Sequence, residues 1–562
     1  MRGRLGELGE DMVWWGRRAA GRLRRGPASA PSREQLIRRR RAVALGALVL
    51  MLYALFRYVP LPGVPCEVSP AKTCATPDDA IALVPAAADA YLHIDLDPDS
   101  SQGSAAAEVA GRLPHAGQIR RGLLGLLGPP PGLELGGDAG DWIGDEAAVA
   151  LLAGGGTLSL LEIGDAEGAR RFAAGLGPGE PSPPRAGGGL RAFSNGIAYA
   201  ELDGFLAVGP SAAVRAAIET QRSTRSLEDS APAGRVRDAL PDQRVADAYL
   251  SPEGAARLLA GRTGLASQLD VLVDFGATEG LGAALVAHRD GFELRLVSVL
   301  GPAGGEPPGR SFFAAFPRFE PRLAAELSPR TLLYVGIADP ARTVRALLRQ
   351  AAQGVPELVT AFQRFAAELR RGGVDVEGDV LPVLSGEAAV AAAEGPSGPY
   401  LTFVFGGVDE ERARETMARL QGPLVAALAP ARTGQAPGFD AERLDGVVMR
   451  RLRLSAALDL AYAVFDGKLV VATNPAGVRQ AVEGTDSLAG TDAYKAATGA
   501  APAGASALVF LNLEGLVRRA GPLGLDQIVR GFAEDVSKLR ALAVNVRSDE
   551  NSLQTTLFLD IE

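Results

Sequence analysis

Apolar residues follow two periods along the chain. Strand-length apolar runs, such as residues 198–208, are followed by stretches with apolar positions three or four residues apart, such as residues 211–219. A period of two is typical of β-strands, and a period near 3.6 is typical of α-helices. The pattern therefore predicts an α+β fold of mainly antiparallel sheet with packed helices.

Two Asp-Gly pairs mark predicted hairpins. Asp203 and Gly204 stand between two β-prone runs, and Asp466 and Gly467 repeat the arrangement in the second half of the chain. Such a pair favours a two-residue turn between antiparallel strands. We interpret these four residues as structural markers of the fold.

Long phrases of the sequence occur twice in the same order. The phrase AYAELDGFLAVGPSAAVRAAIE (198–219) returns as AYAVFDGKLVVATNPAGVRQAVE (461–483). Similarly, LVPAAADAYLHIDLDP (83–98) is answered by LSPRTLLYVGIADP (327–340). We interpret this repetition as the tandem duplication of a unit that lies within the upper size range of a domain.

The phrases delimit the copies. Repeat unit 1 is expected at residues 78–302 and repeat unit 2 at residues 320–562. Residues 303–319 between them are rich in glycine and proline, which is typical of a linker. At 562 residues the chain is also too long for one ordinary core, which agrees with more than one unit.

One repeated phrase carries a glutamate in each copy. Glu146 and Glu387 each precede an Ala/Val-rich run that predicts an inner strand buried in the sheet. We expect both glutamates to point outward. The repetition requires only that a duplicated sheet contain the same inner strand twice, although Glu146 and Glu387 could serve as paired carboxylates if the copies faced each other.

A segment near the N-terminus predicts a transmembrane helix. Residues 42–62 begin with fifteen uncharged residues and follow the basic tail, residues 1–41. A bilayer core requires about 20 apolar residues, and flanking arginines can extend a short span by snorkelling. The positive-inside rule places the N-terminus in the cytoplasm, on the strength of Arg38, Arg39, Arg40 and Arg41. A cleaved signal peptide is the alternative, but no small-x-small cleavage site follows the segment.

The charge distribution agrees with a membrane protein. The first 41 residues hold twelve arginines and four acidic residues, whereas the whole chain has a formal net charge of −8. A nucleic-acid-binding domain should itself be basic, so nucleic acid is not an expected partner. We expect a single-pass protein of the cell membrane, with the lipid bilayer as a partner and the bulk of the chain extracytoplasmic.

Two cysteines lie in the predicted extracytoplasmic spacer, residues 63–77. Cys66 and Cys74 are the only cysteines of the chain. In an oxidising compartment, a close pair predicts a disulfide, with two free thiols as the alternative.

Motifs of known chemistry are missing from the sequence. It contains no P-loop, nucleophile elbow, H-E-x-x-H or dinucleotide fingerprint. Its three histidines, His93, His115 and His288, are scattered. The segment 95–106 begins like a calcium loop but has serine and alanine where glycine and glutamate are needed. We therefore expect no cofactor, no metal site and no catalytic residue.

The phrases at residues 83–98 and 141–151, together with the preceding anchor, resemble a bacterial envelope family catalogued as domain of unknown function 3352. The resemblance implies a long single-pass envelope protein. It implies no activity, so it transfers no functional residue to this chain.

Three hypotheses of function follow. The first is a non-enzymatic binding or scaffold protein of the cell envelope, with an envelope protein as a possible partner. The second is a carrier or sensor of an apolar ligand or lipid, and the third is a hydrolase that uses paired carboxylates. An exposed apolar patch would favour binding, a large closed cavity would favour a carrier, and carboxylates converging in a polar cleft would favour an enzyme.

Overall fold

In the computed structural model, the described part of the chain begins at Cys74. The described residues are 74–118, 142–178, 181–182, 189–223, 225–259, 278–300, 317–354, 356–395, 398–428, 438–455, 458–499, 504–519, 533–549 and 551–562. Within these ranges, no helix is both long and apolar enough to cross a bilayer. The predicted span, Cys66 and the four arginines before the span lie outside them.

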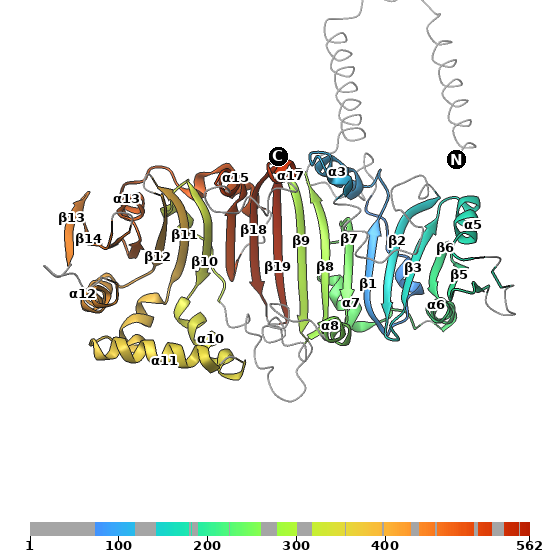
Figure 1. The fold of residues 1–562 in the computed structure, drawn as a ribbon, viewed down its shortest axis with the longest axis horizontal. Helices are drawn as coiled ribbons and strands as arrows, with labels where there is room; N and C mark the ends of the chain where they lie inside the picture. Colours follow the sequence, from blue (N-terminus) through green and yellow to red (C-terminus); the bar gives the residue numbers. More distant parts are fainter. Residues whose placement is uncertain are drawn as a thin grey trace, which may run out of the picture. The chain divides into compact units, whose positions relative to one another are not determined.

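The described strands form one antiparallel sheet (Figure 1). The first half of the chain contributes β1 (Ala88–Asp95), β2 (Ile143–Leu152), β3 (Thr157–Ile163), β4 (Arg191–Ala192), β5 (Ile197–Leu202), β6 (Phe205–Pro210), β7 (Ala246–Leu250), β8 (Thr278–His288) and β9 (Gly291–Leu300). The second half contributes β10 (Thr331–Ala338), β11 (Glu387–Gly395), β12 (Gly398–Gly406), β13 (Phe439–Leu444), β14 (Val447–Arg453), β15 (Asp459–Phe465), β16 (Lys468–Ala472), β17 (Ala507–Asn512), β18 (Leu539–Ser548) and β19 (Ser552–Ile561).

The order of strands on one side of the centre of the sheet approximately mirrors the order on the other side. Pairing runs β4-β5-β6-β3-β2-β1-β7-β8-β9 through the first half and β19-β18-β17-β10-β11-β12-β16-β15-β14-β13 through the second. The two halves join where β9 pairs with β19. Each half therefore continues the sheet of the other, and the last strand of each half pairs with the other half rather than being left as an edge strand.

The registers relate the two halves by a local twofold. In the first half, Tyr91, Tyr249, Gly282 and Val297 are successive cross-strand partners on neighbouring strands. In the second half, Tyr334, Phe510, Ala543 and Phe558 form the corresponding series. Val297 and Phe558 are therefore equivalent positions. At the junction Val297 pairs with Gln554 and Phe558 pairs with Glu293, so that Arg295 pairs with its own equivalent, Thr556. This reciprocal pairing is what an isologous interface requires.

Helices cover one face of the sheet and the outer parts of the other. The helices are α3 (Ser101–Ala110), α5 (Ala166–Ala174), α6 (Ser211–Ser223), α7 (Ala231–Asp238), α8 (Pro252–Leu259), α10 (Pro340–Gly354), α11 (Pro356–Arg371), α12 (Glu410–Leu428), α13 (Pro475–Glu483), α14 (Asp492–Gly499), α15 (Leu513–Arg518) and α17 (Ala533–Val536). Short turns of helix are η1 (Ala80–Leu83), η5 (Leu323–Glu326), η6 (Val376–Val380), η7 (Leu381–Leu384) and η8 (Leu488–Gly490).

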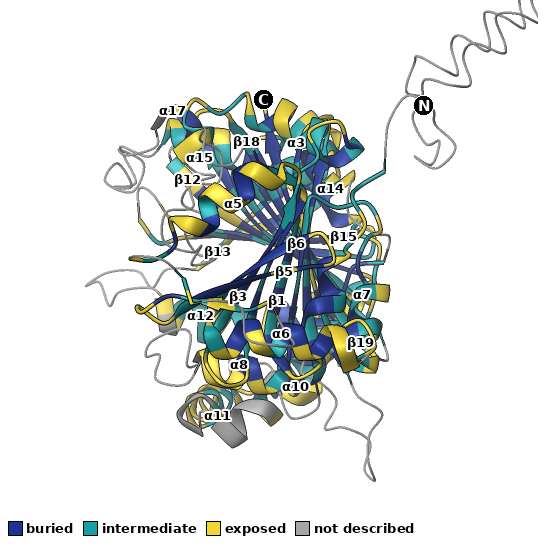
Figure 2. Ribbon diagram, turned by 90° about the vertical axis from the view of Figure 1, so that its right-hand side faces the viewer, coloured by how far each residue is buried: buried dark blue, intermediate teal, exposed yellow. Residues whose placement is uncertain are grey.

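Two large cores lie on the covered face. In the first half, α6, α7 and η1 pack on the sheet around Tyr91 and Tyr249. In the second half, α13, α14, η5 and η8 pack around Tyr334 and Phe510. Figure 2 shows buried residues along the strands and exposed residues on the outer sides of the helices. The predicted α+β fold with a large antiparallel sheet and packed helices is confirmed.

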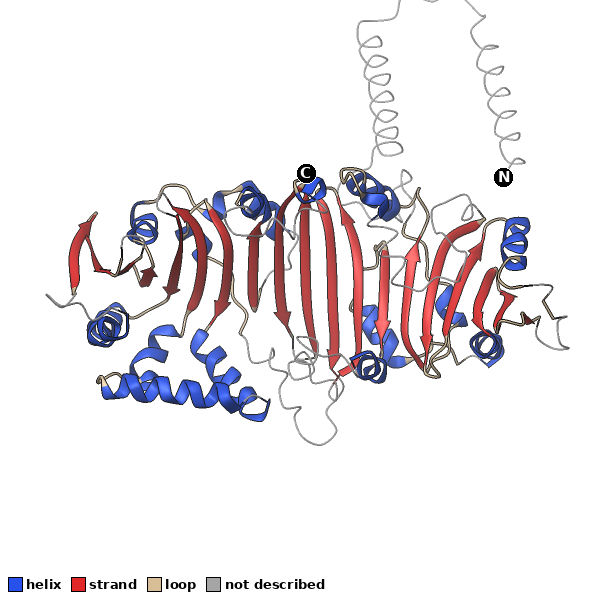
Figure 3. Ribbon diagram, viewed as in Figure 1, coloured by secondary structure: helices blue, strands red, loops and turns tan. Residues whose placement is uncertain are grey.

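Described helices cover the two ends of the opposite face. α5 and Trp142 pack over one end of the sheet, and α12 packs over the other. Helices α10 and α11 pack on each other and on η6 and η7. Consequently the central strands β8, β9, β19 and β18 face the viewer in Figure 3 with no helix drawn in front of them.

Candidate functional site

The Asp-Gly markers form two equivalent turns. Asp203 and Gly204 connect β5 to β6, with φ of 43° and 88°. Asp466 and Gly467 connect β15 to β16, with φ of 47° and 67°. Two consecutive positive φ values are the requirement of a type I′ turn, which Asp-Gly satisfies. These residues therefore shape the hairpins and offer no chemistry.

The repeated glutamates do not point outward. Glu146 is 2% exposed, and it accepts hydrogen bonds from the backbone N–H groups of Asp79 (3.3 Å) and Ala80 (2.9 Å) at the start of η1. Glu387 is half-buried and accepts from the N–H groups of Arg322 and Leu323, both at 2.9 Å, at the start of η5. A carboxylate at this position satisfies N–H groups that a helix start leaves unpaired. The expectation that they face outward is thus wrong, because each caps a short helix.

The two glutamates are also far apart. Glu146 lies on β2 and Glu387 on β11, and nine interstrand spacings separate these strands. At about 4.8 Å per spacing, the separation across the sheet is roughly 43 Å. Retaining and inverting glycosidases place their carboxylates within about 10 Å. Glu146 and Glu387 therefore do not form a catalytic pair.

Apolar side chains line the centre of the sheet face opposite the two large cores, in front of which Figure 3 draws no helix of the described part of the chain. Cross-strand partners share a face, so the registers place one row of residues from each of β1, β7, β8, β9, β19, β18, β17 and β10 on this side. We call this surface the apolar face, and its larger members are Leu92, Ile94, Leu250, Leu281, Leu285, Phe292, Leu294, Leu296, Leu553, Leu557, Leu559, Leu542, Val544, Val546, Val509, Leu511, Leu333, Val335 and Ile337.

None of these side chains is fully buried. Leu294 and Leu296, at the centre, are 36% and 39% exposed, and the other members are half-buried. Eight strands at about 4.8 Å spacing make the apolar face roughly 34 Å across. Monomeric proteins rarely expose contiguous apolar surface on this scale, and such a surface marks an interaction site.

No pattern in the sequence marks the apolar face directly. The Ala/Val-rich run after Glu146 predicts a strand buried on both sides, and this holds only at its start, where Ala147 and Ala148 are both buried. Ala148 and Ala150 are buried toward the helices, whereas Val149 and Leu151 are only half-buried. An apolar residue in a strand has the same letter whether a helix covers it or not, so only the arrangement of helices separates the two cases.

A cluster of ionisable side chains is buried beside η1 in the first half. We call it the polar cluster, and its members are Asp78, Tyr91, His93, Glu146, Arg244 and Asp247. His93 Nδ1 lies 3.1 Å from Asp247 Oδ1, and His93 Nε2 lies 3.6 Å from Glu146 Oε1. His93 and Asp247 are 3% and 4% exposed, so the cluster opens to no polar cleft.

Burial and mutual charge shift the pKa values in the polar cluster. Burial raises the pKa of Glu146 to about 7 and also raises that of Asp78. Burial opposes ionisation of Asp247 too, but its hydrogen bond with His93 and the charge of Arg244 hold its pKa below the usual range. Burial alone would lower the pKa of His93, yet the hydrogen bond to Asp247 and the neighbouring carboxylates raise it.

The equivalent positions of the second half lack this cluster. By register, Gly336 stands where His93 stands and Leu508 where Asp247 stands. Pro321 precedes the capped residues Arg322 and Leu323, as Asp78 precedes Asp79 and Ala80. The second half builds the same strands without these groups, so the polar cluster is dispensable for the architecture.

The remaining sequence candidates have local roles. Asp95 accepts from Ser100 Oγ and from the N–H of Asp97, and Ser100 caps α3, so the calcium-like segment is a helix start. His288 Nε2 lies 2.9 Å from Glu293 Oε2, and His115 Nδ1 lies 2.8 Å from Asp535 Oδ2. Cys74 is the first described residue, and its pairing with Cys66 stays a prediction.

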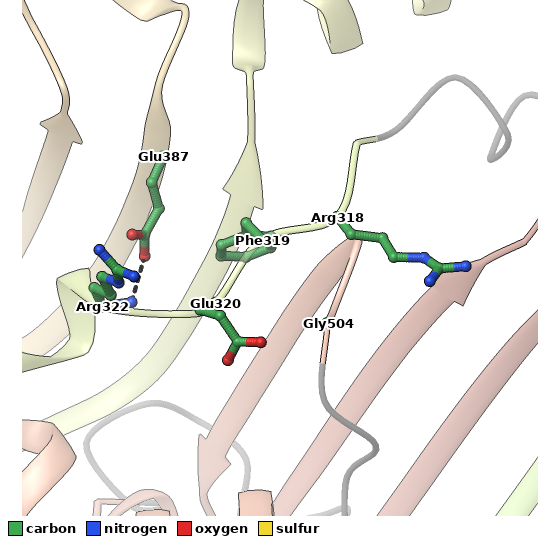
Figure 4. A pocket seen from close by; sticks show the side chains of 6 residues that line it. All are labelled: Arg318, Phe319, Glu320, Arg322, Glu387 and Gly504. Atoms are coloured by element: carbon green, nitrogen blue, oxygen red, sulfur yellow. Dashed lines mark hydrogen bonds between the residues drawn. The ribbon is translucent and has the colours of Figure 1, made fainter.

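A depression of about 430 Å³ adjoins η5 and includes Glu387 (Figure 4). Its other lining residues are Arg318, Phe319, Glu320, Arg322 and Gly504. Glu387 is engaged by backbone N–H groups there, and Arg318 forms an ion pair with Asp549. The depression therefore assembles no set of catalytic groups around a free carboxylate.

Comparison with known proteins gives a family but no activity. No curated protein matches the chain. Among solved structures, crystal form I of TP0453 is similar over 42% of this chain and 83% of that chain, with 11% identity and a TM-score of 0.23. Crystal form III of TP0453 is similar over 41% of this chain and 84% of that chain, with 11% identity and a TM-score of 0.21. A family model described as protein of unknown function (DUF3352) matches residues 43–561, and the chain therefore belongs to this family, as the sequence phrases predicted.

Proposed function

We propose that the protein is a non-enzymatic component of the cell envelope that binds acyl chains of lipids on the apolar face. Residues 42–62 anchor it in the membrane with the N-terminus in the cytoplasm, and the sheet is extracytoplasmic. The observation that carries the proposal is the incompletely buried apolar face across eight central strands, with Leu294 and Leu296 the most exposed of its members.

The chemistry of the apolar face favours acyl chains over a protein partner. Protein interfaces are enriched in aromatic residues and arginine and make about one hydrogen bond per 100–200 Å². On the apolar face the backbone groups are used in the sheet ladder, and its larger members are leucine, isoleucine and valine with one aromatic residue, Phe292, and no arginine. A hydrocarbon chain requires only apolar contact, which this surface supplies.

A tandem duplication accounts for the width of this surface. The repeated phrases and the reciprocal pairing around Arg295 and Thr556 support the proposal that two copies of one unit joined through their last strands. Leu294 on β9 and Leu557 on β19 are cross-strand partners at this junction. The joined copies therefore offer one continuous apolar face where a single copy would offer half.

An enzymatic function has less support. The carboxylates that converge in the described part of the chain belong to the polar cluster, which is buried beside η1 and opens to no cleft. Catalysis requires that a substrate atom reach the acid and base.

The proposal is tested by identifying what the full-length protein carries. The protein is purified from membranes in detergent, and bound amphiphiles are extracted and identified by mass spectrometry. Wild type is expected to retain acyl-chain lipids, and the double variant Leu294→Thr/Leu296→Thr is expected to retain fewer. Val448→Thr is the matched control, because Val448 is an equally exposed strand residue on β14, away from the apolar face. Equal lipid content in wild type and the double variant would overturn the proposal.

A further inference from the structure

We propose that the polar cluster binds a divalent transition-metal ion through His93 Nε2 and the carboxylates of Asp78 and Glu146. Ligand atoms of Asp78, His93 and Asp247 lie within 4.8 Å of one another, and Glu146 Oε1 lies 3.6 Å from His93 Nε2. The inference is independent of the lipid proposal, because the polar cluster lies on the covered face of the sheet.

Two donor atoms in the polar cluster lack a hydrogen bond. His93 Nε2 and Asp78 Oδ2 are both buried and without a hydrogen-bond partner in the described part of the chain. Leaving a buried polar atom unpaired is costly, so a native protein normally satisfies it. Both a carboxylate oxygen and an unprotonated ring nitrogen can donate a lone pair to a metal cation.

The spacing of the groups fits shared coordination. His93 Nε2 and Glu146 Oε1 are 3.6 Å apart, which is too long for a hydrogen bond. Two ligands that each sit about 2.0–2.2 Å from one zinc ion are roughly 3.3–3.6 Å apart in near-tetrahedral geometry. The separation of His93 Nε2 and Glu146 Oε1 therefore matches that of two ligands of one ion. A set of one imidazole and two carboxylates suits Zn²⁺ or Mn²⁺.

Asp247 prepares His93 for this role. Its Oδ1 lies 3.1 Å from His93 Nδ1 and also accepts from Arg244 Nε at 2.7 Å. A carboxylate that accepts from Nδ1–H leaves the lone pair on Nε2, and metal-binding histidines almost always have such a partner. Asp247 is thus a positioning residue.

The duplicated half supplies an internal comparison. Its equivalent positions hold Pro321, Gly336 and Leu508, so the sheet and the capped helix form without these groups. Glu387 retains the cap, which shows that capping needs the glutamate alone. The additional groups around Glu146 are therefore explained by binding rather than by folding.

Metal binding by Asp78 would connect two separate parts of the fold. Asp78 belongs to the segment 74–79 that leads into η1, whereas His93 and Glu146 belong to β1 and β2. A shared ion would tie this segment to the sheet.

The test measures metal content of the full-length protein in detergent. The protein is stripped with a chelator, equilibrated with Zn²⁺ or with Mn²⁺, desalted and assayed by elemental mass spectrometry. Wild type should hold one ion per chain more than His93→Gln and more than Asp78→Asn. His288→Gln is the matched control, because His288 also contacts a carboxylate, that of Glu293, and it should hold as much metal as wild type.

A separate variant tests the positioning role. Asp247→Asn should keep the ion but weaken its affinity by about 10–100-fold and change the visible absorption of bound Co²⁺, which a loss of stability alone would not change. The proposal is overturned if wild type retains neither metal, or if Asp78→Asn and His93→Gln retain as much as wild type. If His93→Gln does not fold, Asp78→Asn, on a half-buried segment, decides the matter.

Discussion

Replacing two leucines at the centre of the apolar face should weaken acyl-chain binding without unfolding the protein. Leu294 and Leu296 lie on β9 beside the junction of the two halves and are 36% and 39% exposed. Leu→Thr shortens the side chain and adds a hydroxyl, while a β-branched residue remains compatible with a strand.

The size of the effect follows from the exposed fractions. Fully burying a leucine side chain contributes about 1.5–3 kcal/mol. A ligand that covers the remaining third or more of each leucine therefore gains roughly 0.5–1 kcal/mol per residue, or about 1–2 kcal/mol for both. That free energy corresponds to a loss of roughly 5–30-fold in affinity for the double variant.

The assay is displacement of a fluorescent fatty-acyl probe from the full-length protein. Val448→Thr should bind the probe like wild type. The double variant should lose roughly 2–4 kcal/mol of unfolding free energy, because about two thirds of each leucine is already buried, and a cooperative urea transition should show that it is still folded. The reasoning is refuted if the double variant binds as tightly as wild type, or if Val448→Thr weakens binding equally.

Three further changes test other parts of the account. The pKa of Glu146 in the folded protein, about 7, lies above its ordinary value of 4.5, so the folded protein binds the proton more tightly than the unfolded chain does. The resulting contribution of Glu146 to the free energy of unfolding is complete below about pH 4.5 and is lost as the pH rises to about 7. In chelator-stripped protein, Glu146→Gln should remove a decline of up to about 3 kcal/mol in the free energy of urea unfolding between pH 4.5 and 8, whereas Glu387→Gln should alter it less; identical pH profiles for wild type and Glu146→Gln would contradict this. Gly291→Ala should destabilise the protein by about 1–3 kcal/mol, because the added Cβ would lie 1.9 Å from the carbonyl oxygen of Leu559 across the junction; an unchanged urea midpoint would count against a β9–β19 joint. A reporter fused after Glu562 should be active outside the cytoplasmic membrane, and activity confined to the cytoplasm would reverse the proposed topology.

Local features were predictable from the sequence because they depend on neighbours in the chain. The Asp-Gly turns at residues 203–204 and 466–467 need positive φ, and few residue types accept it. The strands and helices around them follow from periods of two and 3.6. The repeated phrases likewise anticipated that corresponding strands would recur in the same order.

Features that depend on distant segments were not predictable. Glu146 was expected to point outward, yet it turns toward η1, because the N–H groups it satisfies lie more than sixty positions earlier. The polar cluster joins residue 78 to residue 247 through the pairing of β1 with β7. The extension of one sheet into the other depends on β9 meeting β19, and no local pattern encodes that choice.

The most direct test of the account is photolabelling with an acyl chain that carries a diazirine, followed by identification of the labelled peptides by mass spectrometry. Binding on the apolar face predicts labels on β8, β9, β18 and β19, reduced in Leu294→Thr/Leu296→Thr. Labels confined to other parts of the chain, or no label above that of a control protein, would contradict it.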